Sequence, residues 1–213
     1  MKKRQAGFPV DPAADSGPAS LDHAVACLKK GGIVAFPTET YYGLAADPFN
    51  EQALQSLFRL KERDSRKPVL VLINDIKQLG LIAQSVPDVY RPLMERFWPG
   101  PLTLIFPGRR DLIPLLTGGT GTIGVRISSN AIATELCRRW GGPITATSAN
   151  VSGKVPAVSA DEVEAAFRSG VQWVIDGGNA PAGGASTIVG TGDGRLRLIR
   201  KGQIEFSTIL SQE

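Results

Sequence analysis

The sequence predicts a single α/β domain built on a mixed sheet with flanking helices. Short apolar runs typical of strands alternate irregularly with amphipathic segments, and several strands follow one another late in the chain, which favours a mixed sheet over a regular parallel one. The 213 residues suffice for one sizeable core. Because no linker-like segment or internal repeat divides the chain, we expect one domain over residues 20–213, preceded by a flexible leader over residues 1–19.

Individual elements follow from hydrophobic spacing and from turn residues. A first helix is expected with Ser20 as its N-cap and with Gly31-Gly32 as its stop. Further helices are predicted from Asn50 to Leu60, over residues 87–97 and over residues 131–140. Strands are predicted at 33–37, 69–73, 102–106, 122–127, 143–147, 171–176, 185–189 and 195–199.

Composition narrows the class of protein. Two cysteines without a CxxC pattern and a single histidine argue against a disulfide framework or a Cys/His zinc site, so we expect no protein metal site and a cytoplasmic location. No apolar run reaches the roughly 20 residues of a membrane-spanning helix, and the basic start lacks the apolar stretch of a secretory signal. The net charge of +4 is compatible with anionic partners but does not identify them.

Several familiar catalytic patterns are missing. The stretch GTGTIG (119–124) matches G-x-G-x-x-G but leads into a predicted strand instead of a helix, which argues against dinucleotide binding. No P-loop pattern exists, and His23, the single histidine, lies in a predicted helix beside apolar neighbours, so a Ser-His-Asp or Cys-His arrangement lacks its base. The remaining Lys, Arg, Ser and Thr side chains suit phosphoryl or nucleotidyl transfer, which needs positive charge and positioning without a protein nucleophile.

Four segments offer such groups, and each also has an unremarkable interpretation. The stretch RLKERDSRKP (59–68) holds five cations and could be an anion site or a solvated helix end. The stretch PTETYYG (37–43) follows a strand, where ligands often bind in open α/β sheets. Arg126 ends a strand and could hold a carboxylate or phosphate, or could be a surface arginine. Residues 147–150, TSAN, could bind a ligand or form a polar turn.

Taken together and in this order, these segments resemble the YrdC/Sua5 family of threonylcarbamoyl-adenylate synthases. PTETYYGL is similar to the family's P-T-[ED]-T-x-Y-G-L stretch, Lys61-Glu62-Arg63 to its K-x-R, and Ser148-Ala149-Asn150 to its S-x-N. WPGPLT (98–103), GVR (124–126), IDGG (175–178), STIV (186–189) and Arg200 follow in family order, so the resemblance covers roughly residues 20–205.

The resemblance implies a twisted, mostly open mixed sheet around a large basic cavity. The implied reaction combines L-threonine, bicarbonate and ATP into L-threonylcarbamoyl-adenylate and pyrophosphate, with Mg²⁺ travelling with the nucleotide. A transferase complex then passes the threonylcarbamoyl group to adenosine 37 of tRNAs, so direct tRNA contact is an open possibility. By position, the resemblance implies L-threonine contacts at Thr40, Arg126 and Ser186, and ATP contacts at Lys61, Arg63, Lys67, Thr122, Ser148, Asn150 and Arg200.

The resemblance has departures and leaves alternatives. Some relatives carry a histidine where this chain has Leu72, and longer members add a second domain, so we expect the short single-domain form. Arg59 and Arg66 fall outside the matched positions and are predicted to be solvated surface charges. The alternatives are a non-catalytic paralogue that binds double-stranded RNA or tRNA, and carbamoyl-adenylate chemistry on another acceptor, as in hydrogenase-maturation proteins. Retention of K-x-R, S-x-N and the PTET threonine favours the synthase.

Overall fold

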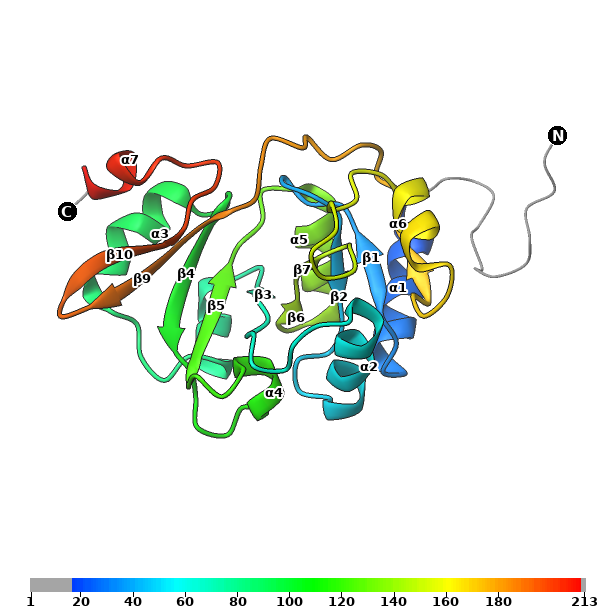
Figure 1. Cartoon of the computed structure of the whole chain (residues 1–213), viewed down its shortest axis with the longest axis horizontal. Helices are drawn as coiled ribbons and strands as arrows, with labels where there is room; N and C mark the ends of the chain where they lie inside the picture. Colours follow the sequence, from blue (N-terminus) through cyan, green and yellow to red (C-terminus); the bar gives the residue numbers. More distant parts are fainter. Residues whose placement is uncertain (1–16, 212–213) are drawn as a thin grey trace, which may run out of the picture.

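The structure, a computed structural model, describes residues 17–211 and confirms the mixed α/β fold class (Figure 1). The strands divide over two sheets instead of the single sheet expected, with orders β7-β2-β1-β8 and β10-β9-β4-β5-β3-β6. The pairing is mixed in both sheets, since β1–β8, β3–β5 and β4–β9 are parallel and the other pairs are antiparallel. The strands are β1 (Val34–Phe36), β2 (Gly43–Ala45), β3 (Val71–Leu72), β4 (Leu102–Pro107), β5 (Thr122–Arg126), β6 (Ile144–Thr145), β7 (Thr147–Ser148), β8 (Trp173–Val174), β9 (Thr187–Gly192) and β10 (Arg195–Arg200).

The two sheets meet where the chain passes from β6 to β7. These two-residue strands form edges of different sheets and are separated only by Ala146. The Ala46 amide donates to the Thr145 hydroxyl over 2.8 Å, and the Thr145 amide donates to the Ala46 carbonyl over 3.0 Å. These two bonds tie the strand segments together at the junction, so residues at the neighbouring strand ends face a shared space.

The helices agree with the sequence prediction where hydrophobic spacing is strong. The predicted helix over 131–140 coincides with α5, and Asn50 caps α2 by accepting from the Ala53 amide over 3.1 Å. The helical bounds are α1 (Pro18–Lys29), α2 (Glu51–Lys61), η1 (Ile76–Leu81), η2 (Asp88–Tyr90), α3 (Arg91–Phe97), α4 (Pro114–Thr117), α5 (Ala131–Trp140), α6 (Ala160–Phe167) and α7 (Phe206–Leu210). Of these, η1, α4, α6 and α7 were not predicted.

The prediction of Ser20 as the first N-cap was wrong. Helix α1 begins at Pro18 with Gly17 as its N-cap, because the Ser20 hydroxyl lies inside the first turn and accepts instead from the Trp173 indole over 3.1 Å. The domain therefore starts before residue 20, and residues 1–16 of the predicted leader lie outside the described residues.

Two groups of buried side chains hold the layers together. Helices α1 and α5 pack against one another and against residues of β1, with Leu28, Phe36 and Leu136 fully enclosed. A larger core, to which α2 and α6 contribute, includes residues of β4 and β5. None of the helices within residues 17–211 is long and apolar enough to cross a membrane.

Candidate active site

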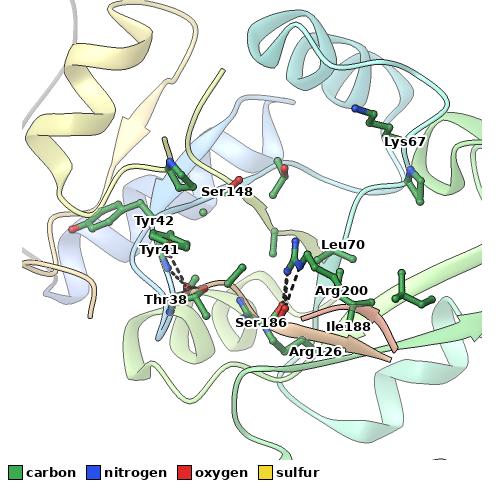
Figure 2. A pocket seen from close by; sticks show the side chains of 18 of the residues that line it. Thr38, Tyr41, Tyr42, Lys67, Leu70, Arg126, Ser148, Ser186, Ile188 and Arg200 are labelled. Carbon is green, nitrogen blue, oxygen red and sulfur yellow. Dashed lines mark hydrogen bonds between the residues drawn. The ribbon is translucent and has the colours of Figure 1, made fainter. Parts of the chain in front are cut away.

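A cavity of about 420 Å³ lies between the two sheets, with walls formed from both (Figure 2). Its lining comes from the turn after β1, the segment before β3, strand β4, the end of β5, the β6–β7 junction, the loop after β7 and the ends of β9 and β10. Seven of the ten predicted site residues line it: Thr40, Arg63, Lys67, Arg126, Ser148, Ser186 and Arg200. Among residues 17–211, the lining contains four cationic side chains and no carboxylate, so the cavity suits anionic ligands.

One end of the cavity is built around Ser186, Arg126 and Arg200 (Figure 2). Although Arg200 is exposed overall, its guanidinium donates to the Ser186 carbonyl over 2.9 Å and to the Ser186 hydroxyl over 3.0 Å. The Ser186 hydroxyl also forms a 2.9 Å hydrogen bond with the buried Thr103 hydroxyl. Ser186 is thus fixed between a strand and a cation. The resemblance implied an ATP contact for Arg200, but the structure places it beside the implied threonine contacts.

Arg126 and Arg200 together give the Ser186 end of the cavity its positive charge. Arg126, the last residue of β5, is only 7% exposed. Burial lowers the pKa of Arg126, and the Glu39 carboxylate opposes this effect. Burial of the guanidinium and the nearby charge of Arg126 both lower the pKa of Arg200. Two neighbouring guanidinium groups, of which Arg126 disfavours the charge of Arg200, form a ready site for a carboxylate.

Glu39 lies behind the end of the cavity that contains Ser186, Arg126 and Arg200. Its Oε1 atom lies 3.0 Å from Arg126 Nη1, and its Oε2 atom accepts from the Ser128 hydroxyl. The Oε1 and Nη1 atoms are both buried and lack a hydrogen bond of good angle, so the contact between them is an ion pair. Sequence reasoning missed this role, because the pairing of a loop carboxylate with a strand arginine depends on tertiary packing.

The turn after β1 is closed by its own hydroxyl groups. The Thr38 hydroxyl donates to the Tyr41 carbonyl over 2.7 Å and lies 2.9 Å from the Thr40 hydroxyl. It also accepts from the Thr40 amide over 3.1 Å. These bonds fix the turn locally, and both Thr40 and Tyr41 line the cavity.

A second cationic end lies across the cavity, where Arg63 and Lys67 line the wall. Figure 2 shows Lys67 away from Arg126 and Arg200. The Arg63 guanidinium donates to the Pro68 carbonyl over 2.8 Å, and burial lowers its pKa while Asp64 opposes this effect. Outside the cavity, Arg59 is exposed and Arg66 forms a 2.8 Å ion pair with Asp64. The prediction of Arg59 and Arg66 as surface charges is therefore confirmed.

Lys61 lies behind the cavity wall and is 1% exposed. Its Nζ atom donates to the Ser148 carbonyl, to the Asn150 carbonyl over 2.6 Å and to Asn150 Oδ1 at 3.4 Å. Asn150 Oδ1 in turn accepts from the Ser148 hydroxyl over 2.6 Å. Burial, together with the nearby charge of Arg63, lowers the pKa of Lys61 to about 7. Lys61 and Asn150 thus hold Ser148 in place and lie outside the cavity lining.

Thr122 and Leu72 both lie outside the cavity lining. Thr122 is the first residue of β5, and its hydroxyl pairs with the Thr120 hydroxyl over 2.9 Å. Arg126 lies four residues further along the strand, about 13 Å away at the usual rise, so the structure does not bring Thr122 to the cavity. Leu72 is 1% exposed and packs in the core with α1 and α5, whereas Leu70 of the same segment lines the cavity.

An apolar wall of the cavity was not predicted. It consists of Leu70, Ile105, Ile188 and Ile199, which come from four separate segments of the chain. Apolar runs in the sequence mark these segments as strands, but they do not reveal which face of each strand borders a ligand. This wall gives the cavity one face for uncharged parts of a ligand.

Comparison with known proteins identifies the family. The family model Sua5_yciO_yrdC, described as "Telomere recombination", matches residues 26–202. The chain belongs to this family. Relatives named threonylcarbamoyl-AMP synthase are 37% identical in Pyrococcus abyssi, over 87% of this chain and 55% of the relative, and 37% identical in Bacillus subtilis, over 96% and 59%. The chain therefore spans little more than half the length of these two relatives.

A shorter relative and two solved structures are also similar to the chain. A threonylcarbamoyl-AMP synthase of Stenotrophomonas maltophilia is 39% identical over 74% of this chain and 86% of its own length. The structure of P. abyssi Sua5 complexed with L-threonine superposes with a TM-score of 0.87 and 35% identity, over 90% of this chain and 56% of that one. E. coli YciO shares the fold with a TM-score of 0.80 at 22% identity, over 95% of this chain and 97% of its own.

Close backbone packing beside Ser186 gives a first testable prediction. A Cβ atom on Gly202 would lie 2.3 Å from the Thr187 amide nitrogen and 2.4 Å from the Ser186 carbonyl carbon. Because these neighbours are backbone atoms, Gly202→Ala should lower the free energy of unfolding by about 1–3 kcal/mol. Gly183→Ala is the matched control, since its nearest neighbour would be the flexible Gln203 side chain at 3.4 Å. Thermal melting checks this, and equal melting temperatures for the two variants would contradict it.

Proposed function

We propose that the chain is an L-threonylcarbamoyladenylate synthase that condenses L-threonine, bicarbonate and ATP and releases pyrophosphate. The observation that carries the proposal is a single cavity with two separate cationic ends, in a chain that belongs to the family of the synthases named above. Arg126 and Arg200 suit an amino-acid carboxylate, whereas Arg63 and Lys67 suit a triphosphate. The enzyme would be a nucleotidyltransferase.

The residues divide into contacts and supports. We assign Thr40, Arg126 and Ser186 to L-threonine and add Arg200 to this group because of its bonds to Ser186. Arg63, Lys67 and Ser148 are the ATP contacts that line the cavity. Lys61 and Asn150 support Ser148 from behind.

The chemistry needs charge stabilisation more than proton transfer. Carboxylation of the threonine amine by bicarbonate gives a carbamate with loss of water, and a carbamate oxygen then attacks the α-phosphorus of ATP. The bond from that phosphorus to the pyrophosphate oxygen breaks, so negative charge develops on the leaving pyrophosphate. Arg63 and Lys67 are placed to stabilise that charge, and the residues act by positioning and electrostatics without a covalent intermediate.

Magnesium is proposed to arrive with the nucleotide. Within residues 17–211, no cluster of three or more His, Cys, Asp or Glu side chains is arranged to hold a metal ion. Mg²⁺ usually binds through substrate phosphates and few protein ligands, and it neutralises part of their charge when bound. The described residues therefore suit a metal held mainly by ATP.

The product would serve tRNA modification in the cytoplasm. A threonylcarbamoyl transferase complex is the proposed recipient, and adenosine 37 of tRNA is the final acceptor. Against the alternative of a binding-only paralogue, Arg63 and Arg200 donate inward to backbone carbonyls at the cavity instead of forming an exposed stripe along a surface. Backbone-dominated RNA binding requires such an exposed stripe of phosphate contacts.

A substrate-omission assay tests the proposal. Pyrophosphate release from ATP should require both L-threonine and bicarbonate, because the attacking carbamate needs both. Release that continues unchanged when either one is left out would refute the synthase. Binding of duplex RNA that weakens steeply with salt and ignores threonine would instead support the binding-only paralogue.

A further inference from the structure

Glu39 differs from every side chain that lines the cavity, because it is acidic and lies behind the wall. Its carboxylate meets Arg126 Nη1 at 3.0 Å and is held on its other oxygen by the Ser128 hydroxyl. The Glu39 side chain is 12% exposed, and that of Arg126 is 8% exposed. Burying an ion pair of this kind carries a desolvation free energy that offsets the attraction between the charges. The pair is therefore better explained by a role in specificity than by a contribution to stability.

The carboxylate makes the two ends of the cavity unequal in charge. At the Ser186 end, two guanidinium groups and one carboxylate leave a single net positive charge. At the other end, Arg63, Lys67 and the buried Lys61 form no ion pair with a carboxylate of residues 17–211. The charge of Asp64 acts on Arg63 and Lys67, but Asp64 forms its ion pair with Arg66, which carries the matching positive charge. A single positive charge matches a monoanionic carboxylate, whereas the stronger end matches a polyphosphate.

The ion pair also fixes the direction of Arg126. Nη1 is occupied by Glu39, so the remaining donors of the guanidinium are available to the cavity that Arg126 lines. The main chain at Glu39 is held as well, since its carbonyl accepts from the Gln203 side chain over 3.3 Å. Turn, strand and carboxylate therefore position Arg126 from behind.

We propose that Glu39 is a positioning and specificity-determining residue that orients Arg126 and keeps the amino-acid end at one positive charge, so that it accepts a monocarboxylate and rejects polyphosphate anions. This inference rests on the proposed function, because the monoanion is taken to be the threonine carboxylate. Charge alone would predict that loss of Glu39 strengthens carboxylate binding. The positioning role of Glu39 predicts instead that its loss weakens carboxylate binding.

The test is calorimetric titration of L-threonine without ATP, in the presence and absence of pyrophosphate. Glu39→Gln keeps the shape and removes the charge, so we expect threonine affinity to fall about tenfold and pyrophosphate to become a competitor of threonine. Glu39→Asp keeps the charge, but its shorter side chain does not reach Arg126 as well. Its affinity for threonine should therefore fall, and pyrophosphate should not compete with threonine. Ser128→Ala should weaken threonine binding in the same way. Glu135→Gln, which changes a half-buried carboxylate on α5 that is paired with Arg138 and Arg139 outside the cavity lining, is the matched control and should behave as the wild type.

Each outcome separates the inference from the function. Failure of the wild type to bind threonine would refute the proposed function itself. Normal binding by the wild type together with unchanged or tighter binding by Glu39→Gln, and no competition by pyrophosphate, would overturn the role of Glu39. If Glu39→Gln does not fold, as judged by circular dichroism, Glu39→Asp and Ser128→Ala decide, and wild-type affinity in both would overturn the proposal.

Discussion

Replacing Arg126 by alanine should reduce kcat/KM for L-threonine by about 10- to 150-fold while leaving the KM for ATP within about twofold. The expected loss corresponds to the roughly 1.5–3 kcal/mol of a charge-assisted hydrogen bond. A second effect should appear in stability, because the change leaves the Glu39 carboxylate buried without its cation. Breaking one partner of a buried pair typically costs about 3–5 kcal/mol, so the variant should also melt at lower temperature.

Matched variants separate these two effects. Arg63→Ala, at the other end of the cavity, should mainly weaken ATP use, since Arg63 shares the wall with Lys67. Arg138→Ala removes an exposed arginine from α5 and should change the kinetic constants for neither threonine nor ATP. Steady-state kinetics with each substrate varied in turn make the comparison. Equal, negligible losses for threonine and ATP in both cavity variants would count against the residue assignments.

Replacing Lys61 by methionine should weaken ATP use by tenfold or more. The change leaves three oxygen acceptors around an apolar side chain, so the turn that carries Ser148 loses its support. It also removes a buried positive charge from the end of the cavity that we assign to the triphosphate. Lys154→Met, at an exposed lysine of the same loop, is the control and should keep wild-type kinetics.

The pH dependence of stability offers an independent check on Lys61. Burial and the charge of Arg63 lower its pKa to about 7 from the ordinary value of 10.5, so between these values the unfolded chain binds a proton that the folded chain lacks. The contribution of Lys61 to the free energy of unfolding should therefore rise with pH over that range, by up to about 1.4 kcal/mol per pH unit. Below pH 7 this contribution is constant. Chemical denaturation at several pH values should show the rise in the wild type and lose it in Lys61→Met; identical profiles would refute the assignment.

Secondary structure was predictable where the local sequence of one segment determines its conformation. Helices α5 and α2 follow from the local spacing of apolar residues, and the structure confirms them, with Asn50 as the N-cap of α2. The short strand β2 was missed, because three residues carry no periodic signal and gain their pairing only from β1 and β7. The division into two sheets was missed for the same reason, since a single residue, Ala146, separates strands of different sheets.

The candidate site shows the same limit. Motif resemblance selected seven residues that the fold brings to one cavity, although they lie as far apart as Thr40 and Arg200. It could not distinguish lining from support, so Lys61 and Asn150 were grouped with residues that reach the cavity. Nor could it find Glu39 as the partner of Arg126, because burial and the facing of side chains are set by packing between distant segments.

The most direct measurement is the identity of the product. The protein is incubated with ATP, L-threonine and ¹³C-bicarbonate, and the nucleotide products are analysed by mass spectrometry. The proposed function predicts a new adenylate that contains threonine and one carbonyl carbon, heavier by one mass unit than the product made from unlabelled bicarbonate. Consumption of ATP without a labelled threonine adenylate, or no reaction at all, would contradict the account.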